Sequence, residues 1–113
     1  MNPIASTPEP PYLAVIFTNL RSAHDDDGYG EAAARMVELA SDIPGFLGVE
    51  SVRGSDGVGI TVSYWTDHDA IARWRTHPEH LDTQARGRNE WYERYELRVA
   101  HVDRARSYRS SHD

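Results

Sequence analysis

The feature of this chain that most constrains its fold is the run of residues 43–65, in which two strand patterns are joined by a turn sequence. Pro44 and Gly45 end the helical pattern before it, because proline cannot continue a helix and glycine accepts the left-handed backbone that often follows one. Residues 46–53 and 58–65 have the composition and alternation of strands, and the Gly-Ser-Asp-Gly between them has hairpin turn chemistry. Helical patterns flank the hairpin on both sides. The segment therefore predicts a helix, two antiparallel strands and a second helix, in that order.

Residues 12–20 predict an earlier strand, because β-branched and aromatic residues dominate them. Both faces of this strand are apolar until Thr18 and Asn19, and such a pattern is typical of a strand that is covered on both sides. The apolar residues are Leu13, Val15 and Phe17 on one face and Ala14, Ile16 and Leu20 on the other.

The segment after this strand predicts an amphipathic helix that begins near Gly28. Asp25, Asp26 and Asp27 precede it, where carboxylates can cap the first turn and complement its positive end. Apolar residues then recur three and four positions apart, with charged residues on the other side. The predicted buried stripe is Tyr29, Ala33, Met36, Val37, Ala40 and Ile43.

A second helical pattern follows the hairpin, with Asp67 as its expected N-cap. Pro78 lacks the N–H that the preceding turn would need, so this helix is expected to kink or to restart near Thr76, where Thr-His-Pro-Glu has capping-box spacing. Gly87 is expected to end the second piece. The apolar stripe of this helix is Ile71, Trp74, Pro78, Leu81 and Ala85.

The rest of the chain predicts a short helical turn over residues 88–93 and a long last strand over residues 95–108. Tyr95, Leu97 and Val99 share one face of that strand. The complete order is β-α-β-β-α-β, an α+β fold of the ferredoxin-like kind. We expect a four-stranded antiparallel sheet with both helices on one face.

The length and composition of the chain limit its class. A chain of 113 residues is long enough for one core, so we expect a single domain over residues 12–108 with flexible ends at residues 1–11 and 109–113. The absence of cysteine excludes disulfides and thiolate chemistry and fits a reducing compartment, so a cytoplasmic location is expected. The formal charge of −6 disfavours nucleic acid as a partner. The N-terminal residues lack the apolar run of a signal peptide or a membrane span, so no membrane association is expected.

The predicted sheet has a second face that the helices do not cover. If that face met water, the strands should alternate cleanly between apolar and polar residues. The first strand does not, and the third carries Val58, Ile60, Val62 and Tyr64 on one face and Trp65 on the other. A second copy of the chain would cover the open face, so we predict a homodimer.

A helix that ends in Pro-Gly-Phe, followed by a hairpin whose second strand ends in Tyr64 and Trp65 before the next helix, resembles the antibiotic biosynthesis monooxygenase (ABM) domains. The resemblance covers about residues 12–108. It implies a dimeric α+β barrel with a pocket between the helices and the concave sheet. It also implies a monooxygenase that oxidises an aromatic or quinonoid small molecule with molecular oxygen and needs no cofactor, because the substrate itself supplies the electrons.

Four residues are candidates for catalysis in such a pocket. Asn19 ends an apolar strand, where its amide can hold a substrate carbonyl or an oxygen derived from dioxygen; the alternative is that it satisfies loop backbone groups. Trp74 serves either as a pocket wall or as core. His77 and His80 titrate near neutral pH and can move a proton; the alternative places both at the exposed rim of the helix. The expected substrate-binding residues are Tyr64, Trp65 and Gln84.

The haem-degrading branch of the same superfamily provides the first alternative function. That branch combines an asparagine on the first strand, a tryptophan on the helix after strand three, and a histidine ten positions later that binds the haem iron. Asn19 and Trp74 match the first two, but Gln84 stands at the third position and glutamine is a poor iron ligand. Haem would therefore need His80 or His77. The second alternative is a non-enzymatic dimer that binds a hydrophobic molecule; no metal site is expected, because no third ligand accompanies the two histidines.

Overall fold

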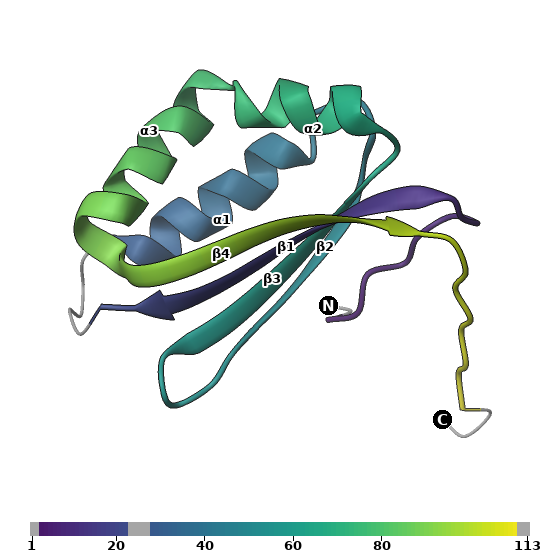
Figure 1. The fold of residues 1–113 in the computed structure, drawn as a ribbon, viewed down its shortest axis with the longest axis horizontal. Helices are drawn as coiled ribbons and strands as arrows, with labels where there is room; N and C mark the ends of the chain where they lie inside the picture. The colour runs from purple at the N-terminus through teal and green to yellow at the C-terminus, as the bar shows by residue number, and fades with distance from the viewer. Residues whose placement is uncertain (1–2, 23–27, 111–113) are drawn as a thin grey trace.

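The computed structural model describes residues 3–22 and 28–110, which form a four-stranded antiparallel sheet with the helices on one side of it (Figure 1). The spatial order of the strands is β2-β3-β1-β4. The α+β, ferredoxin-like fold is confirmed, with the second helix divided in two. The elements are β1 (Tyr12–Arg21), α1 (Tyr29–Ala40), β2 (Phe46–Arg53), β3 (Val58–Trp65), α2 (His68–Arg75), α3 (Pro78–Arg86), the π-helical turn η1 (Gly87–Trp91) and β4 (Tyr92–Val102).

The hairpin of β2 and β3 occupies the residues that the sequence indicates. The N–H of Gly57 donates to the carbonyl of Gly54 at 3.1 Å and closes the turn. At the other end of β2, Gly45 has a φ of 96°, a left-handed conformation that favours glycine. A Cβ on Gly45 would lie 2.5 Å from the Cβ of Ala70, so the missing side chain also lets α2 approach the start of β2.

The helix starts are partly as predicted. Asp67 caps α2, where its carboxylate accepts a hydrogen bond from a backbone N–H of the first turn at 2.8 Å. The helix is interrupted before Pro78 as expected, but His77 rather than Thr76 is the N-cap of α3, and its Nδ1 accepts from the N–H of Glu79 at 3.2 Å. The Thr76 hydroxyl instead donates to a carbonyl of α2 at 2.9 Å, so it already serves the end of that helix.

The buried side of α1 differs from the predicted stripe. Ala33 and Val37 are exposed, Val37 to 44%, whereas Leu39 is half-buried. Apolar residues surround more than half of this helix, so periodicity alone does not fix the arc that faces the sheet. Gly28 is the N-cap of α1, and the capping residues predicted at 25–27 lie outside the described residues.

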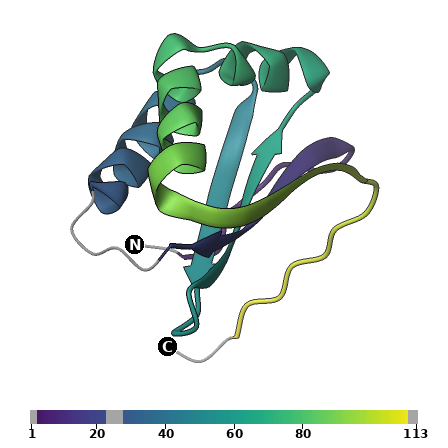
Figure 2. The ribbon, with the colours of Figure 1, turned by 60° about the vertical axis from the view of Figure 1, so that its left-hand side comes forward.

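The last part of the chain also differs from the prediction. Leu81 of α3 is 48% exposed, and Gly87 ends α3 as its C-cap but keeps a helical backbone and begins η1. β4 ends at Val102, which pairs with Tyr12, the first residue of β1. The residues after Val102 have no β1 residue opposite them, so the strand cannot continue. Residues 103–110 leave the sheet as an extended segment (Figure 2).

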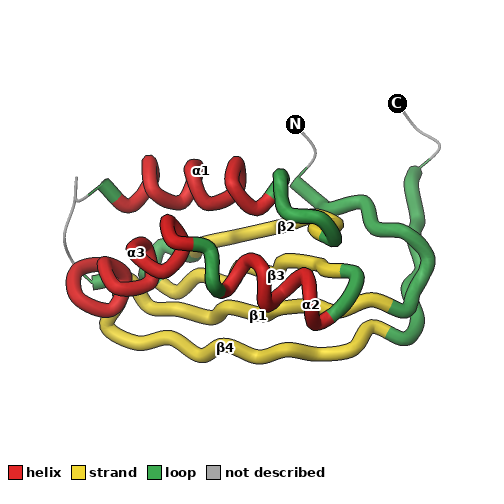
Figure 3. The backbone as a smooth tube through the Cα atoms, turned by 90° about the horizontal axis from the view of Figure 1, so that it is seen from above, coloured by secondary structure: helices red, strands yellow, loops and turns green. Residues whose placement is uncertain are grey.

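The core lies between α1, α2 and the sheet. Trp65 is fully buried and packs with Ala40 and Ala70, while Phe46 and Trp74 are partly buried against them. Seen from above, α1 lies on the β2 side of the sheet and α2 lies over β1 and β3, so β4 forms the edge farthest from α1 (Figure 3). This placement explains why apolar side chains of β4 on the helix side are exposed, Leu97 to 54% and Val99 to 49%.

Candidate functional site

Asn19 lies near the end of β1, on the face of the sheet that carries the helices. Side chains alternate along a strand, so Asn19 shares this face with Val15, which packs against the core, and with Phe17. In the ladder Asn19 pairs with Gly59 of β3 and Tyr95 of β4. Only 3% of Asn19 is exposed, an unusual burial for an asparagine, and this calls for a physical explanation.

The guanidinium of Arg53 reaches Asn19 across the neighbouring strand. Its Nη2 donates to Asn19 Oδ1 at 2.7 Å and to the Tyr29 hydroxyl at 2.9 Å, and its Nη1 donates to the carbonyl of Gly57 at 2.6 Å. A Cβ on Gly59 would lie 2.7 Å from the Arg53 Cζ. The side chain of Arg53 therefore crosses β3 at the one position where that strand has a glycine facing it.

The amide nitrogen of Asn19 is left as an unpaired donor. A guanidinium can only donate, so Asn19 must present Oδ1 to Arg53, and Nδ2 is the end that remains. Nδ2 is buried and has no hydrogen-bond partner among the residues that the structure describes. A buried donor without an acceptor costs about 1–3 kcal/mol, so a ligand oxygen placed against Nδ2 would recover that energy.

Aromatic rings surround this polar contact. The Tyr92 hydroxyl donates to the Tyr29 hydroxyl at 3.1 Å, and the two rings lie nearly perpendicular, 5.7 Å apart. Phe17 packs edge-on against Tyr92 at 5.3 Å. Burial, followed by the bond to Tyr29, raises the pKa of the Tyr92 phenol, so it stays protonated and neutral. We call Asn19, Arg53, Tyr29, Tyr92 and Phe17 the Asn19 site.

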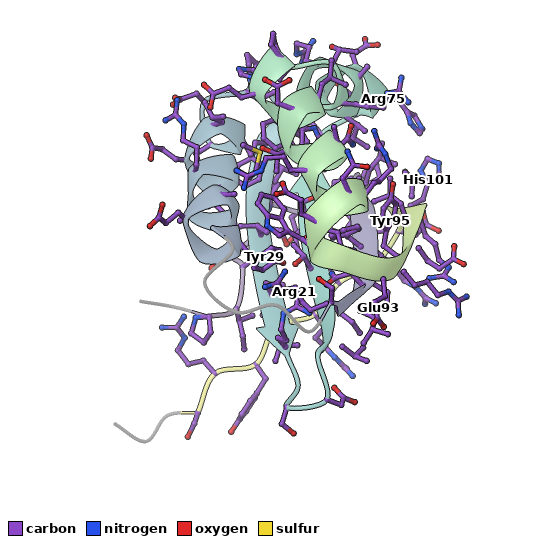
Figure 4. All side chains as sticks on the ribbon, turned by 90° about the vertical axis from the view of Figure 1, so that its left-hand side faces the viewer. Arg21, Tyr29, Arg75, Glu93, Tyr95 and His101 are labelled. Atoms are coloured by element: carbon purple, nitrogen blue, oxygen red, sulfur yellow. The ribbon has the colours of Figure 1, made fainter. Side chains whose placement is uncertain are left out.

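The Asn19 site is bordered by a second cation. The guanidinium of Arg21 lies 4.0 Å from the centre of the Tyr29 ring and donates to the carbonyl of Trp91 at 3.1 Å. Arg21 and Tyr29 lie close together beside α1, whereas Tyr95 lies on the side of β4 (Figure 4). The site therefore combines aromatic surface with positive charge.

Sequence reasoning found Asn19 but missed Arg53, Tyr29 and Tyr92. Tyr29 belongs to the apolar pattern of α1, and Arg53 ends a strand next to a turn, where charged residues are common. The signal that was available is Gly59, because a glycine inside a strand often marks a close approach by another group.

Trp74 and His80 form a second cluster with Trp65. The rings of Trp74 and His80 are stacked, with centres 4.1 Å apart and planes 13° apart, and Trp65 lies 6.4 Å from Trp74. His80 Nδ1 lies 2.9 Å from the carbonyl oxygen of Trp74. Burial lowers the pKa of His80, so its ring is neutral near pH 7; Nδ1–H then donates to that carbonyl and Nε2 keeps a lone pair.

The structure does not bring all the predicted site residues together. Trp65 pairs with Leu13 of β1, and Asn19 lies six positions further along that strand, which corresponds to about 20 Å. His77 lies 6.1 Å from Trp74 but its Nδ1 caps α3, and Gln84 is half-buried on the same helix.

Tyr64 lies on the opposite face of the sheet from Trp65, because the two are consecutive in β3. Its hydroxyl donates to Glu50, and it packs edge-on against Tyr12. Burial and the bond to Glu50 raise the pKa of Tyr64 to about 12.

A shallow hollow of about 340 Å³ also opens on this face of the sheet, lined in part by Leu20, Val58 and the charged side chains of Arg94, Glu96 and Arg98.

Comparison with known proteins gives a consistent assignment. The family model described as antibiotic biosynthesis monooxygenase matches residues 11–86. The uncharacterized protein YqjZ of Bacillus subtilis is 58% identical over 98% of this chain and 96% of its own length. The jasmonate monooxygenase ABM of Pyricularia oryzae is 32% identical over 80% of this chain and 43% of its own length.

Solved structures share the fold at low sequence identity. SnoaB of Streptomyces nogalater, a cofactor-independent oxygenase, has a TM-score of 0.68 and is 17% identical, with 92% of this chain and 100% of that chain covered. Among the residues that the structure describes, no helix has both the length and the apolar character to span a membrane.

Proposed function

Since the chain belongs to the antibiotic biosynthesis monooxygenase family, we propose that it oxidises an aromatic or quinonoid small molecule with molecular oxygen and without a bound flavin or metal. In the balanced reaction, a phenol that carries a ring C–H opposite its hydroxyl reacts with O2 to give a quinone and water. One oxygen atom enters the ring, the other leaves as water, and the substrate supplies all the electrons. The protein must then bind the ring away from water, hold its oxygen and move a proton.

The observation that carries this proposal is the buried, unpaired Nδ2 of Asn19 beside aromatic rings. Such a donor fits the oxygen of a phenol or quinone, and the rings of Phe17 and Tyr92 offer the apolar surface that its ring system needs. SnoaB, which shares this fold, is described as a cofactor-independent oxygenase, and this supports chemistry without a cofactor. The Pyricularia relative is named for jasmonate, which is not aromatic, so the family name alone does not select the substrate.

Trp74, His80 and His77 are proposed to form the other end of the site. The neutral ring of His80 can accept a proton at Nε2, and the stacked Trp74 holds that ring in place. Trp65, which lies against Trp74, pairs with Leu13 about 20 Å along β1 from Asn19, so a ligand that touches both Asn19 and Trp65 would need an elongated ring system. The proposed lining residues are Trp65 and Gln84.

We predict that Asn19→Ala lowers oxygen consumption about a hundredfold, because it removes the donor that holds the substrate oxygen. The measurement is O2 uptake with a panel of polycyclic phenols and hydroquinones. The thermal midpoint should change by only a few degrees, since Asn19 loses one hydrogen bond and one unpaired buried group together.

The matched control is Asn89→Ala, which alters an exposed asparagine of η1. Equal turnover in the two variants would contradict the role of Asn19. A large loss of stability in Asn19→Ala would identify it as a structural residue instead. Tight binding of the aromatic molecules without any O2 uptake would favour a non-enzymatic binding protein.

We also propose that the open face of the sheet is covered by a second copy of the chain. Val52, Val58 and Ile60 are 70%, 40% and 41% exposed there, an apolar surface that a monomer would leave in water. A role of Tyr64 in substrate binding would then require a ligand at this interface.

Ile60→Arg is expected to convert a dimer of twice 12.8 kDa into a monomer, because it places a charge at the centre of the apolar face. Light scattering at micromolar concentration measures the mass. Val37→Arg is the control, since Val37 is 44% exposed but lies on α1. A wild-type mass near 12.8 kDa would contradict the dimer.

Haem binding is the alternative that the geometry of His80 favours. With Nδ1 against the carbonyl of Trp74, Nε2 is the nitrogen left to ligate iron. Titration with hemin tests this function by the appearance of a Soret band. The band should be lost in His80→Ala or His77→Ala and should persist in the control His68→Ala.

A further inference from the structure

The contact between Arg53 and Asn19 decides which end of the buried amide is offered to a ligand. If the amide were turned over, its NH2 group would face the guanidinium of the exposed Arg53, and two donors would meet at a buried asparagine. The observed bond of 2.7 Å from Nη2 to Oδ1 therefore selects a single orientation. In that orientation Asn19 can only donate to a bound molecule.

Arg53 is itself held in a fixed position. Its guanidinium donates to three acceptors from three parts of the fold, which are Asn19 of β1, Tyr29 of α1 and the carbonyl of Gly57 in the hairpin turn. The missing side chain of Gly59 provides its path, since a Cβ there would approach all three terminal atoms of the guanidinium within 2.9 Å. Most of these restraints are independent of Asn19, so the guanidinium stays in place when the amide is altered.

The charge near the amide favours an anionic ligand. Among the residues that the structure describes, Arg53 makes no ion pair with a carboxylate. Its hydrogen-bond partners are the hydroxyl of Tyr29, the amide of Asn19 and the carbonyl of Gly57, and the cation of Arg21 lies beyond the Tyr29 ring. A negative oxygen bound at Asn19 Nδ2 would thus lie next to the positive charge of Arg53, which no carboxylate of the described residues neutralises.

We infer that Arg53 is a positioning residue that turns the Asn19 amide into a fixed donor for an oxyanion, and that the ligand binds as a phenolate or enolate rather than as the neutral phenol or ketone. This inference rests on the proposed function, because it takes an aromatic hydroxyl compound as the ligand. It adds the protonation state in which that compound binds and the residue that selects it. The ring of the ligand packs against Phe17 and Tyr92, and its oxygen accepts from Nδ2 of Asn19.

The test measures the pKa of a bound phenol in the absence of oxygen. The probe is 4-nitro-1-naphthol, whose phenolate absorbs visible light and whose neutral form does not. Wild-type protein should lower the pKa of the bound probe by about one unit, a tenfold preference for the anion. Asn19→Ala and Arg53→Met should both abolish this shift, and Arg53→Lys should keep part of it, because lysine retains the charge but not the forked donors.

Arg75→Met serves as the matched control, since Arg75 is an exposed arginine of α2, and it should leave the shift unchanged. Circular dichroism checks that each variant is folded. If Arg53→Met fails to fold, Gly59→Ala tests the same contact, because the added methyl displaces the guanidinium, and it should also reduce the shift.

Three results would overturn the inference. The first is that wild-type protein does not bind the probe or does not lower its pKa. The second is that folded Arg53→Met lowers the probe's pKa as much as wild type does, and the third is that Arg75→Met loses the pKa shift to the same extent as Arg53→Met. The anaerobic readout separates this inference from the proposed reaction. A shift that depends on Arg53 without O2 uptake would refute only the oxygenase, whereas O2 uptake that depends on Asn19 without any shift would refute only the role of Arg53.

Discussion

A Trp65→Ala variant is expected to lose about 3–5 kcal/mol of its free energy of unfolding. Trp65 is fully buried at the end of β3, where its ring packs edge-on against Phe46 at 5.2 Å and its indole N–H donates to Ser63 Oγ at 2.9 Å. Alanine would leave a cavity between the sheet and α2, where the ring packs with Ala40 and Ala70. Urea unfolding followed by circular dichroism measures the change.

The control for this prediction is Val37→Ala. Val37 belongs to the apolar pattern of α1 but is 44% exposed, so its truncation should cost less than about 1 kcal/mol. Similar losses at Trp65 and Val37 would contradict the position of the core.

Gly45→Ala should cost about 2–4 kcal/mol, because two effects add at this position. The backbone has a φ of 96°, which alanine adopts only with strain. The new Cβ would also lie 2.5 Å from the Cβ of Ala70 and 2.6 Å from Thr66 Oγ1, so α2 must move away from β2. The thermal midpoint should fall by about 10 °C or more.

Gly30→Ala is the matched control, and we expect it to raise stability where Gly45→Ala lowers it. Gly30 lies inside α1, and apart from its chain neighbours and the backbone of the helix, no heavy atom of residues 3–22 and 28–110 lies within 4 Å of the position that its Cβ would take. Alanine should therefore raise stability by up to about 1 kcal/mol through helix propensity. A Gly45→Ala protein as stable as wild type would show that α2 does not depend on this close approach.

The fold could be predicted largely from the sequence because its signals are local. Pro44, Gly45 and the turn glycines limit the hairpin, and Asp67 and Pro78 mark the starts of α2 and α3. The predictions failed where a choice depends on the rest of the molecule. Val37 is exposed because of how α1 lies on the sheet, and β4 ends at Val102 because β1 begins at the residue opposite it.

The candidate site could be predicted only in part for the same reason. Asn19 was visible as a polar residue at the end of an apolar strand. The other hydrogen-bonded residues of the Asn19 site are Arg53, Tyr29 and Tyr92; they come from three other elements, and no spacing in the sequence brings them together. The stacking of Trp74 on His80 was also hidden, because it arises where α2 ends and α3 begins.

The pairing of β1 with β4 affects the order in which the molecule can be completed during synthesis. β1, α1 and the hairpin leave the ribosome first, and β1 can then pair with β3 on one side. Its other edge must wait for β4, which pairs with it from Tyr12 opposite Val102 to Arg21 opposite Tyr92. A nascent chain therefore displays an apolar strand with an open edge, a surface that invites aggregation, until β4 emerges. Tyr92 arrives with β4, so the Asn19 site is assembled only after α1 and the hairpin have already formed around it.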